Sequence, residues 1–406
     1  MKSTHATPSR LRSFEDCQIE THVFLKMILG RGFAPSRQEY TALEKGLSIG
    51  DQAMDTFVEA GFRSACPGQH WKEFQQTLIT GNTTDLPELK NLLLMAQTPP
   101  FIPDWEQAKR GALFIHRTGT LATDVLRDMA LMGGYLMAAF NQTLVMTGDL
   151  EKGVASRLAN TSHWWLRVTQ PDANQAGKSG FEATLRVRWI HAMVRRHLKN
   201  HPQWNASIFG LPINQIDMAA TYLGFSFVML LGLRKSGVYV SKENSRAVMH
   251  LWKIIAWQMG VDEQWLVDTE AQAAVKLRQY VMTHTRPDET TYKLAKALAD
   301  EPLTRNYRNL SMVRRRMAWL SHMSSSAWLL GPSTLKKLGL SSPLGPWLKP
   351  VELAPQAAWF YLHSVHYRLE KRQSINGRNA QIKAVSEIHF DQKEVKKSTH
   401  PATPVS

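Results

Sequence analysis

The chain has 406 residues, of which 43% are hydrophobic and 20% charged, and its formal net charge is +15. This composition excludes disorder for most of the chain and permits a large hydrophobic core. Its two cysteines, Cys17 and Cys66, form no CxxC pair, which excludes a disulfide framework and a zinc ribbon and fits a reducing compartment.

The two ends of the chain are predicted to be polar extensions of one α-helical domain. Residues 1–20 are polar and lack the apolar core of a secretory signal, so we expect a cytoplasmic protein. Residues 373–406 are predicted to be a basic, polar tail. Between them, in residues 21–372, long stretches free of glycine and proline alternate with short breaks, while strand-like alternation is nearly absent. The predicted fold is all-α, with a globin-like core and additional helices.

The segment 152–169 is predicted to be a helix with a polar pair on one face. Arg157 and Thr161 are four residues apart and therefore share that face. One interpretation is a solvated arginine beside a threonine that the helix tolerates. The other is a distal pocket, in which a cationic donor and a hydroxyl hold bound dioxygen. Trp164 and Trp165 would then form an apolar wall.

The segment 182–199 contains no glycine or proline and is predicted to be a helix that carries His191 on an apolar stripe. Arg188 and Arg195 border that stripe, one turn away on either side. A buried neutral histidine with a backbone partner, beside two arginines that reach the surface, is one explanation. The alternative is a haem site, because a neutral imidazole is a common iron ligand and guanidinium groups pair with haem propionates.

Residues 214–235 are predicted to form a central buried helix. Asn214 is a good N-cap with Asp217 three residues later, and Gly237 marks the end. The uncharged apolar run Met218–Leu233 is shorter than the roughly 20 residues that span a bilayer. A buried helix is therefore expected instead of a membrane span.

A run of arginines within Val313–Met317 is the clearest basic cluster. It lies near Arg305 and Arg308 and is followed by Trp319 and Trp328. A solvated helix face and peripheral contact with an anionic membrane surface are both open. Nucleic-acid binding is not expected, because the other basic residues are spread out and are not interleaved with aromatic residues in a known motif.

Three motifs in this order resemble the oxygenase family of latex clearing protein and the MpaB-type enzymes. The resemblance is clearest over residues 103–237. Its motifs are Arg157-x-x-x-Thr161, then Arg188-x-x-His191-Ala192 with Arg195, then Gly210-x-Pro212-x-Asn214-Gln215-x-Asp217 with Thr221 and Phe225.

The resemblance implies a haem b-dependent oxygenase. His191 would be the proximal iron ligand, Arg157 and Thr161 would lie on the distal side, and Arg188 and Arg195 would support the cofactor. Dioxygen would act on an apolar, alkene-bearing, isoprenoid-like small molecule, since members of the family cleave carbon–carbon double bonds of isoprenoid chains.

Two positions depart from the rubber-cleaving relatives. Asn160 replaces a lysine that can occupy the iron, and Asn141 stands near the place of a glutamate base. Rubber cleavage by the same proton route is therefore not expected. Two other interpretations remain open: a haem-binding sensor or carrier without turnover, and a basic helical adaptor without cofactor that binds a membrane or nucleic acid.

Overall fold

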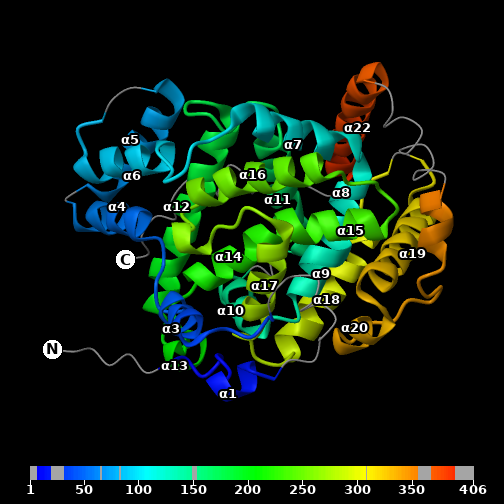
Figure 1. Cartoon of the computed structure of the whole chain (residues 1–406), viewed down its shortest axis with the longest axis horizontal. Coiled ribbons are helices and arrows are strands. Elements are labelled where there is room, and N and C mark those ends of the chain that lie inside the picture. Colours follow the sequence, from blue (N-terminus) through cyan, green and yellow to red (C-terminus); the bar gives the residue numbers. More distant parts are fainter. Residues whose placement is uncertain are drawn as a thin grey trace.

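The computed structural model describes residues 7–19, 32–64, 66–81, 84–148, 153–307, 309–354 and 367–388. Within these ranges the chain is helical and has no strand, so the predicted all-α class is confirmed (Figure 1). Residues 1–6 and 389–406 of the two predicted extensions lie outside the described residues, as does Arg308 of the basic cluster.

The described chain forms α-helices interrupted by short 3-10 and π segments. The first half contains α1 (Phe14–Cys17), α3 (Arg37–Gly46), α4 (Gln52–Arg63), α5 (Pro67–Thr80), α6 (Pro87–Gln97), α7 (Trp105–Arg117), α8 (Thr120–Val125), the π-helix η1 (Leu126–Leu131), α9 (Met132–Gly134), α10 (Ala138–Met146), α11 (Val154–Val168), α12 (Ser179–Lys199) and α13 (Ala206–Phe209). The second half contains α14 (Gln215–Leu223), the π-helix η2 (Gly224–Val228), α15 (Met229–Lys235), α16 (Lys242–Gln258), η3 (Glu263–Trp265), α17 (Glu270–Val281), α18 (Glu289–Asp300), η4 (Glu301–Thr304), α19 (Ser311–Leu330), α20 (Pro332–Lys337) and α22 (Tyr367–Glu387).

The predicted central helix is confirmed as the continuous run α14, η2 and α15. The Asn214 side chain accepts a hydrogen bond from the Asp217 amide at 3.0 Å, which satisfies one unpaired N–H of the first turn. Gln215–Lys235 is long and apolar enough to cross a membrane, but 67% of its most apolar window is buried. Helices α8, α16 and α17 and the π-helix η1 pack around it.

The residues at the start of the central helix contact segments that are distant in the sequence. Gly210 has a φ of +71°, and a Cβ there would lie 2.4 Å from the Leu47 carbonyl oxygen, so only glycine fits. The buried Gln215 amide donates to the carbonyls of Gly50 and Gly260, both at 2.9 Å. The motif that opens the central helix therefore has a structural role.

The N-terminal segment is not a detached extension in its described part. Arg10 is buried and donates to Asp217 of α14, with Nη2 to Oδ1 at 2.5 Å, and to the Thr283 carbonyl at 2.8 Å. The prediction of an extension through residue 20 is therefore wrong for residues near Arg10. A buried guanidinium needs a buried carboxylate as partner, and that partner is about two hundred residues away in the sequence.

The C-terminal tail begins later than predicted. Helix α22 extends to Glu387 and packs against α7, so residues 373–387 belong to the folded domain. Its contacts include both polar and apolar side chains: the buried Gln381 amide donates to the carbonyls of Ile115 and Gly119, and Val385 is part of the main hydrophobic core. The predicted boundary is wrong because this helix has few large apolar residues and docks largely through buried polar side chains and one close glycine contact.

Gly377 permits the close approach of α22 to α7. A Cβ at this position would lie 2.0 Å from the His116 carbonyl oxygen, so Gly377→Ala must push the helices apart. We predict that this change lowers the free energy of unfolding by about 1–3 kcal/mol, as measured in urea.

Gly68→Ala in α5 is the matched control, since nothing lies within 4 Å of its added Cβ. This variant should be neutral or more stable by up to about 1 kcal/mol through helix propensity. Equal stability changes for the two variants would show that α22 does not depend on this contact.

Candidate functional site

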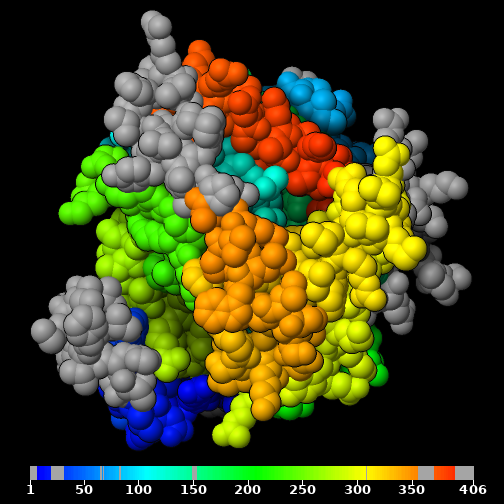
Figure 2. All heavy atoms as spheres, turned by 90° about the vertical axis from the view of Figure 1, so that its right-hand side faces the viewer, coloured from blue at the N-terminus to red at the C-terminus, as the bar shows by residue number. Residues whose placement is uncertain are grey.

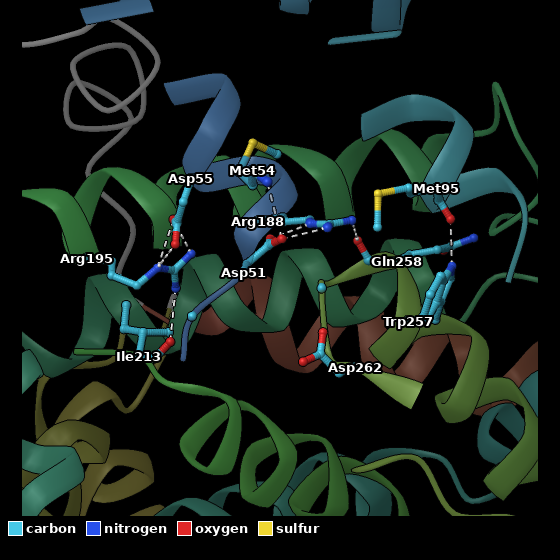
Figure 3. A network of polar contacts seen from close by, with 12 residues as sticks. Asp51, Met54, Asp55, Met95, Arg188, Arg195, Ile213, Trp257, Gln258 and Asp262 are labelled. Carbon is cyan, nitrogen blue, oxygen red and sulfur yellow. Dashed lines mark hydrogen bonds and ion pairs between the residues drawn. The ribbon is translucent and has the colours of Figure 1, made fainter. Parts of the chain in front are cut away.

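Helix α12, which carries His191, is anchored to α4 and the residue before it by two arginine–aspartate pairs (Figure 3). The buried Arg188 binds both carboxylate oxygens of Asp51, with Nη2 to Oδ1 at 2.7 Å, and also donates to the Gln258 carbonyl at 3.2 Å. Such a two-pronged pair fixes the orientation of the guanidinium as well as its position.

The second pair joins the buried Arg195 to Asp55 of α4. Arg195 Nη2 donates to Asp55 Oδ1 at 2.7 Å, and its Nη1 donates to the Ile213 carbonyl at 3.0 Å (Figure 3). Burial raises the pKa of the Asp55 carboxyl above its usual value, while its hydrogen bond to Arg195 opposes that rise. Arg195 thus connects α12 both to α4 and to the turn before the central helix.

These contacts correct one of the two interpretations of the arginines. Neither Arg188 nor Arg195 reaches the surface, so the surface-arginine explanation is wrong for both. Their charges are balanced inside the protein by Asp51 and Asp55. Contact of Arg188 and Arg195 with haem propionates stays a prediction, and the role that the contacts support is anchoring α12.

His191 lies between the two anchors, on the edge of the buried face of α12. Its side chain is partly exposed, but Nδ1 is buried and has no hydrogen-bond partner among the described residues. Burial lowers the pKa of His191 to about 4, with a further lowering by Arg195 that Asp51 opposes. The imidazole is therefore neutral at neutral pH, which is the form that binds iron.

Helix α11, which carries the predicted distal pair, packs against the helix that carries His191. α11 and α12 pack against each other, and Trp164 Nε1 of α11 donates to Thr184 Oγ1 of α12 at 3.3 Å. The chain reverses between the two helices. Arg157 precedes Trp164 by seven residues on α11, and His191 follows Thr184 by seven residues on α12, so the two residues are equally far along the chain from the Trp164–Thr184 contact. Arg157 is partly buried and Thr161, on the same face, is exposed.

Tyr135 is a site residue that sequence reasoning missed. Its ring is fully buried at the end of α9, and its hydroxyl accepts a hydrogen bond from Arg157 Nη2. The guanidinium carbon of Arg157 lies 5.7 Å from the centre of the same ring. Arg157 is therefore held by a phenol and is not a free surface arginine. No local pattern marks Tyr135, because the contact joins two helices.

Aromatic side chains pack together where α11 meets the central helix. Trp164 contacts Phe225 edge-on with ring centres 5.4 Å apart, and Phe225 stacks on Trp252 at 5.0 Å. Phe225 lies in the π-helix η2, which packs against the π-helix η1. Such segments are frequent at functional sites. Trp165, by contrast, is buried in the core on the other face of α11.

The two positions that depart from the rubber-cleaving pattern lie in different environments. Asn160 is exposed on α11. Asn141 is fully buried in α10, and its amide donates to the Tyr135 carbonyl at 2.8 Å and to Thr291 Oγ1 of α18 at 3.3 Å. Asn141 therefore supports the segment that carries Tyr135 and has no acid–base function there.

The residues around His191 fit a haem better than a free metal ion. No group of three His, Cys, Asp or Glu residues that could hold a metal is present in the part of the chain that the structure describes. A haem would need as little as one side-chain ligand from the protein, and an imidazole commonly serves as that ligand. The neutral His191 imidazole, with a buried nitrogen that has no partner among the described residues, meets that requirement.

A surface cleft elsewhere does not compete with this site. It has a volume of about 310 Å³ at the starts of α7 and α16. Its lining residues are acidic, basic or amide side chains: Asp104, Glu106, Gln107, Arg110, Glu243 and Arg246. None of them is aromatic, and none belongs to the residues around His191.

Comparison with known proteins identifies relatives of the chain. The sequence model of a family described as ER-bound oxygenase mpaB/B'/Rubber oxygenase, catalytic domain, matches residues 119–360. Rubber oxygenase of Streptomyces sp. (strain K30) is 24% identical over 229 residues, or 54% of this chain and 54% of that protein. The chain thus matches about half the length of this relative.

A solved structure has the same fold. The structure of latex clearing protein in the closed state aligns with a TM-score of 0.60 and 18% identity, over 86% of this chain and 92% of that chain. The likeness concerns the fold, and it extends well beyond the region that is similar in sequence.

The two anchoring pairs are predicted to differ in strength. Asp51→Asn keeps the cap that Asp51 gives to α4 but leaves the Arg188 charge buried without a partner, which should cost about 3–5 kcal/mol. Asp55→Asn should cost about 1 kcal/mol, because the Asp55 side chain is 32% exposed and water screens the pair. Urea unfolding of both variants measures the difference, and equal losses would contradict the assignment of Asp51 as the main anchor.

Proposed function

The chain belongs to the family of mpaB-type and rubber oxygenase catalytic domains, and from this premise we propose that it is a haem b-dependent oxygenase that uses dioxygen against an apolar, alkene-bearing, isoprenoid-like molecule. The observation that carries the proposal is the neutral His191 imidazole, which has an unpartnered buried nitrogen and lies on the helix that packs against α11, the helix of Arg157. All the residues to which the proposal assigns a role on the haem lie within the matched region 119–360.

The roles of the side chains follow from their positions. When bound, haem b would supply the iron centre that activates dioxygen. His191 would hold it from α12, whose rotation Arg188 and Arg195 fix through Asp51 and Asp55. The low pKa of His191 keeps its ring unprotonated and ready to coordinate.

Arg157 and Thr161 of α11 would donate hydrogen bonds to a polar group of the reactants. The Tyr135 hydroxyl orients the Arg157 guanidinium, so that this donor is in place before substrate binds. The rings of Trp164 and Phe225 exclude water and offer an apolar surface to the substrate. Asn141 is a buried amide that is hydrogen-bonded to Thr291, so any proton transfer must use another group or water.

A haem-binding sensor or carrier is the second candidate. It is favoured by Asn141, since the amide takes the place of a base and is tied into the core. Such a protein would hold haem through His191 in the same way but would not consume dioxygen with a substrate.

Haem binding is predicted to depend on His191. After expression with ample haem, the wild type should show a Soret band, and His191→Ala should lose or shift it because the iron loses its protein ligand. The matched control is His197→Ala, an exposed histidine on the same helix, which should leave the spectrum unchanged. An unchanged Soret band in His191→Ala would remove the ligand assignment.

Turnover is predicted to require both an alkene and Arg157. The haem-loaded protein should consume dioxygen with squalene but not with squalane, which has the same carbon skeleton without double bonds. Arg157→Ala should keep haem and lower the rate about 100-fold, and Tyr135→Phe should lower it about tenfold by leaving the guanidinium less well oriented. Haem binding without dioxygen uptake for a range of alkenes would favour the sensor or carrier instead.

A further inference from the structure

A group of large apolar side chains is exposed at the start of α19. The exposed fractions are 75% for Leu310, 79% for Met312, 57% for Val313 and 57% for Met317. The second half of the same helix is buried from His322 to Ala327. The first two turns of α19 therefore project from the body of the protein with their apolar side chains outward.

A second apolar group lies on the segment that follows α20. Trp347 is 72% exposed and Val351 is 73% exposed. This segment is fixed against α19, because the Lys349 amide donates to Ser324 Oγ at 3.1 Å. In Figure 2 the start of α19 in yellow and this segment in orange face the same side of the molecule. We call the two groups together the α19 face.

The charge around the α19 face is mainly positive, although Arg314 pairs with Glu387 of α22, with Nη2 to Oε1 at 3.4 Å. Residues 305–354 contain eight Lys or Arg (Arg305, Arg308, Arg314, Arg315, Arg316, Lys336, Lys337 and Lys349) against one acidic residue, Glu352. Arg314, Arg316, Lys336 and Lys337 are exposed.

Other members of the predicted cluster are used inside the protein. Arg305 pairs with Glu301 at 2.8 Å, and Trp328 Nε1 donates to the Lys235 carbonyl at 3.1 Å. The exposed basic cluster is therefore smaller than the one predicted from the sequence. The exposed part of the cluster is the first two turns of α19, where Arg315 donates to the Arg305 carbonyl at 2.7 Å, together with the residues around Trp347.

We propose that the α19 face is a peripheral contact for an anionic lipid bilayer. Arginines and lysines at the rim would lie at the phosphate level, while Leu310, Met312 and Met317 enter the apolar boundary. A tryptophan such as Trp347 favours this interface, because its ring is apolar and its N–H is polar. Two exposed methionines, a valine and a leucine distinguish the face from a nucleic-acid surface, which reads phosphates with cations and stacks bases on aromatic rings.

The geometry fits shallow insertion of the start of α19 into the bilayer surface. It does not fit a helix that lies flat on the membrane. Only the first turns of α19 are exposed, and the rest of the helix is packed against η1 and η4. A few exposed side chains give weak, reversible binding to which each cation adds. The inference does not depend on the cofactor, but a membrane contact would bring the protein to the phase in which an apolar substrate dissolves.

The test is cosedimentation of the full-length protein with vesicles of phosphatidylcholine, with and without phosphatidylserine, at low and high salt. The wild type should bind the serine-containing vesicles at low salt and be released at high salt. Arg314→Gln with Arg316→Gln should weaken binding about 25-fold at low salt, from about fivefold for each arginine. Met312→Ser with Met317→Ser should weaken it at least about tenfold at either salt concentration.

Lys72→Gln with Ile79→Ser is the matched control, because both residues are exposed on α5, far from α19 in Figure 1. This control should bind like the wild type, and circular dichroism should show that every variant is folded. Absence of wild-type binding at low salt would overturn the proposal, as would an equal loss in the α5 control. Binding that the arginine and methionine variants keep would place the contact elsewhere and overturn it too.

Discussion

The two arginine–aspartate pairs that hold α12 set the geometry on which the rest of the site depends. Arg188 and Arg195 are seven residues apart and so emerge from nearly the same side of the helix, while His191 lies roughly 50° around the axis from them. Burying both guanidinium groups against Asp51 and Asp55 therefore fixes the rotation of α12. That rotation leaves His191 at the margin of the buried face, where its ring can meet a ligand.

The same arrangement explains the chemistry of the histidine. Burial and the charge of Arg195 disfavour the imidazolium, and Asp51 offsets this only in part. Leaving Nδ1 buried and unpartnered costs stability in the protein alone, by about 1–3 kcal/mol for an unsatisfied polar group. Other buried imidazole nitrogens, such as His70 Nδ1 and His116 Nε2, also lack a partner among the described residues, so it is the position of His191 between the two anchored arginines that makes it the candidate ligand.

The sequence predicted what depends on neighbours along the chain. The central helix follows from Asn214, Asp217 and a long apolar run, and the structure has it with the predicted bounds. The helix around His191 follows in the same way from a stretch without breakers. The all-α class is the sum of such local signals, and the family resemblance rested on the order of the motifs they carry.

What the sequence did not predict depends on contacts between distant residues. Asp51 and Asp55 lie about 140 residues before their arginines, and nothing near them indicates that they are buried partners. Tyr135 is in reach of Arg157 only because η1 and α9 fold back toward α11. The docking of α22 depends on one glycine and on amide hydrogen bonds, which a search for hydrophobic periodicity does not detect.

The central claim is that His191, presented by the anchored helix α12, coordinates iron across from Arg157. An X-ray structure of the haem-loaded protein, with anomalous diffraction recorded at the iron edge, tests it most directly. The account predicts an iron peak at coordination distance from the His191 imidazole, with both arginine–aspartate pairs intact. A peak beside any other residue, or an α12 turned away from Asp51 and Asp55, would contradict it.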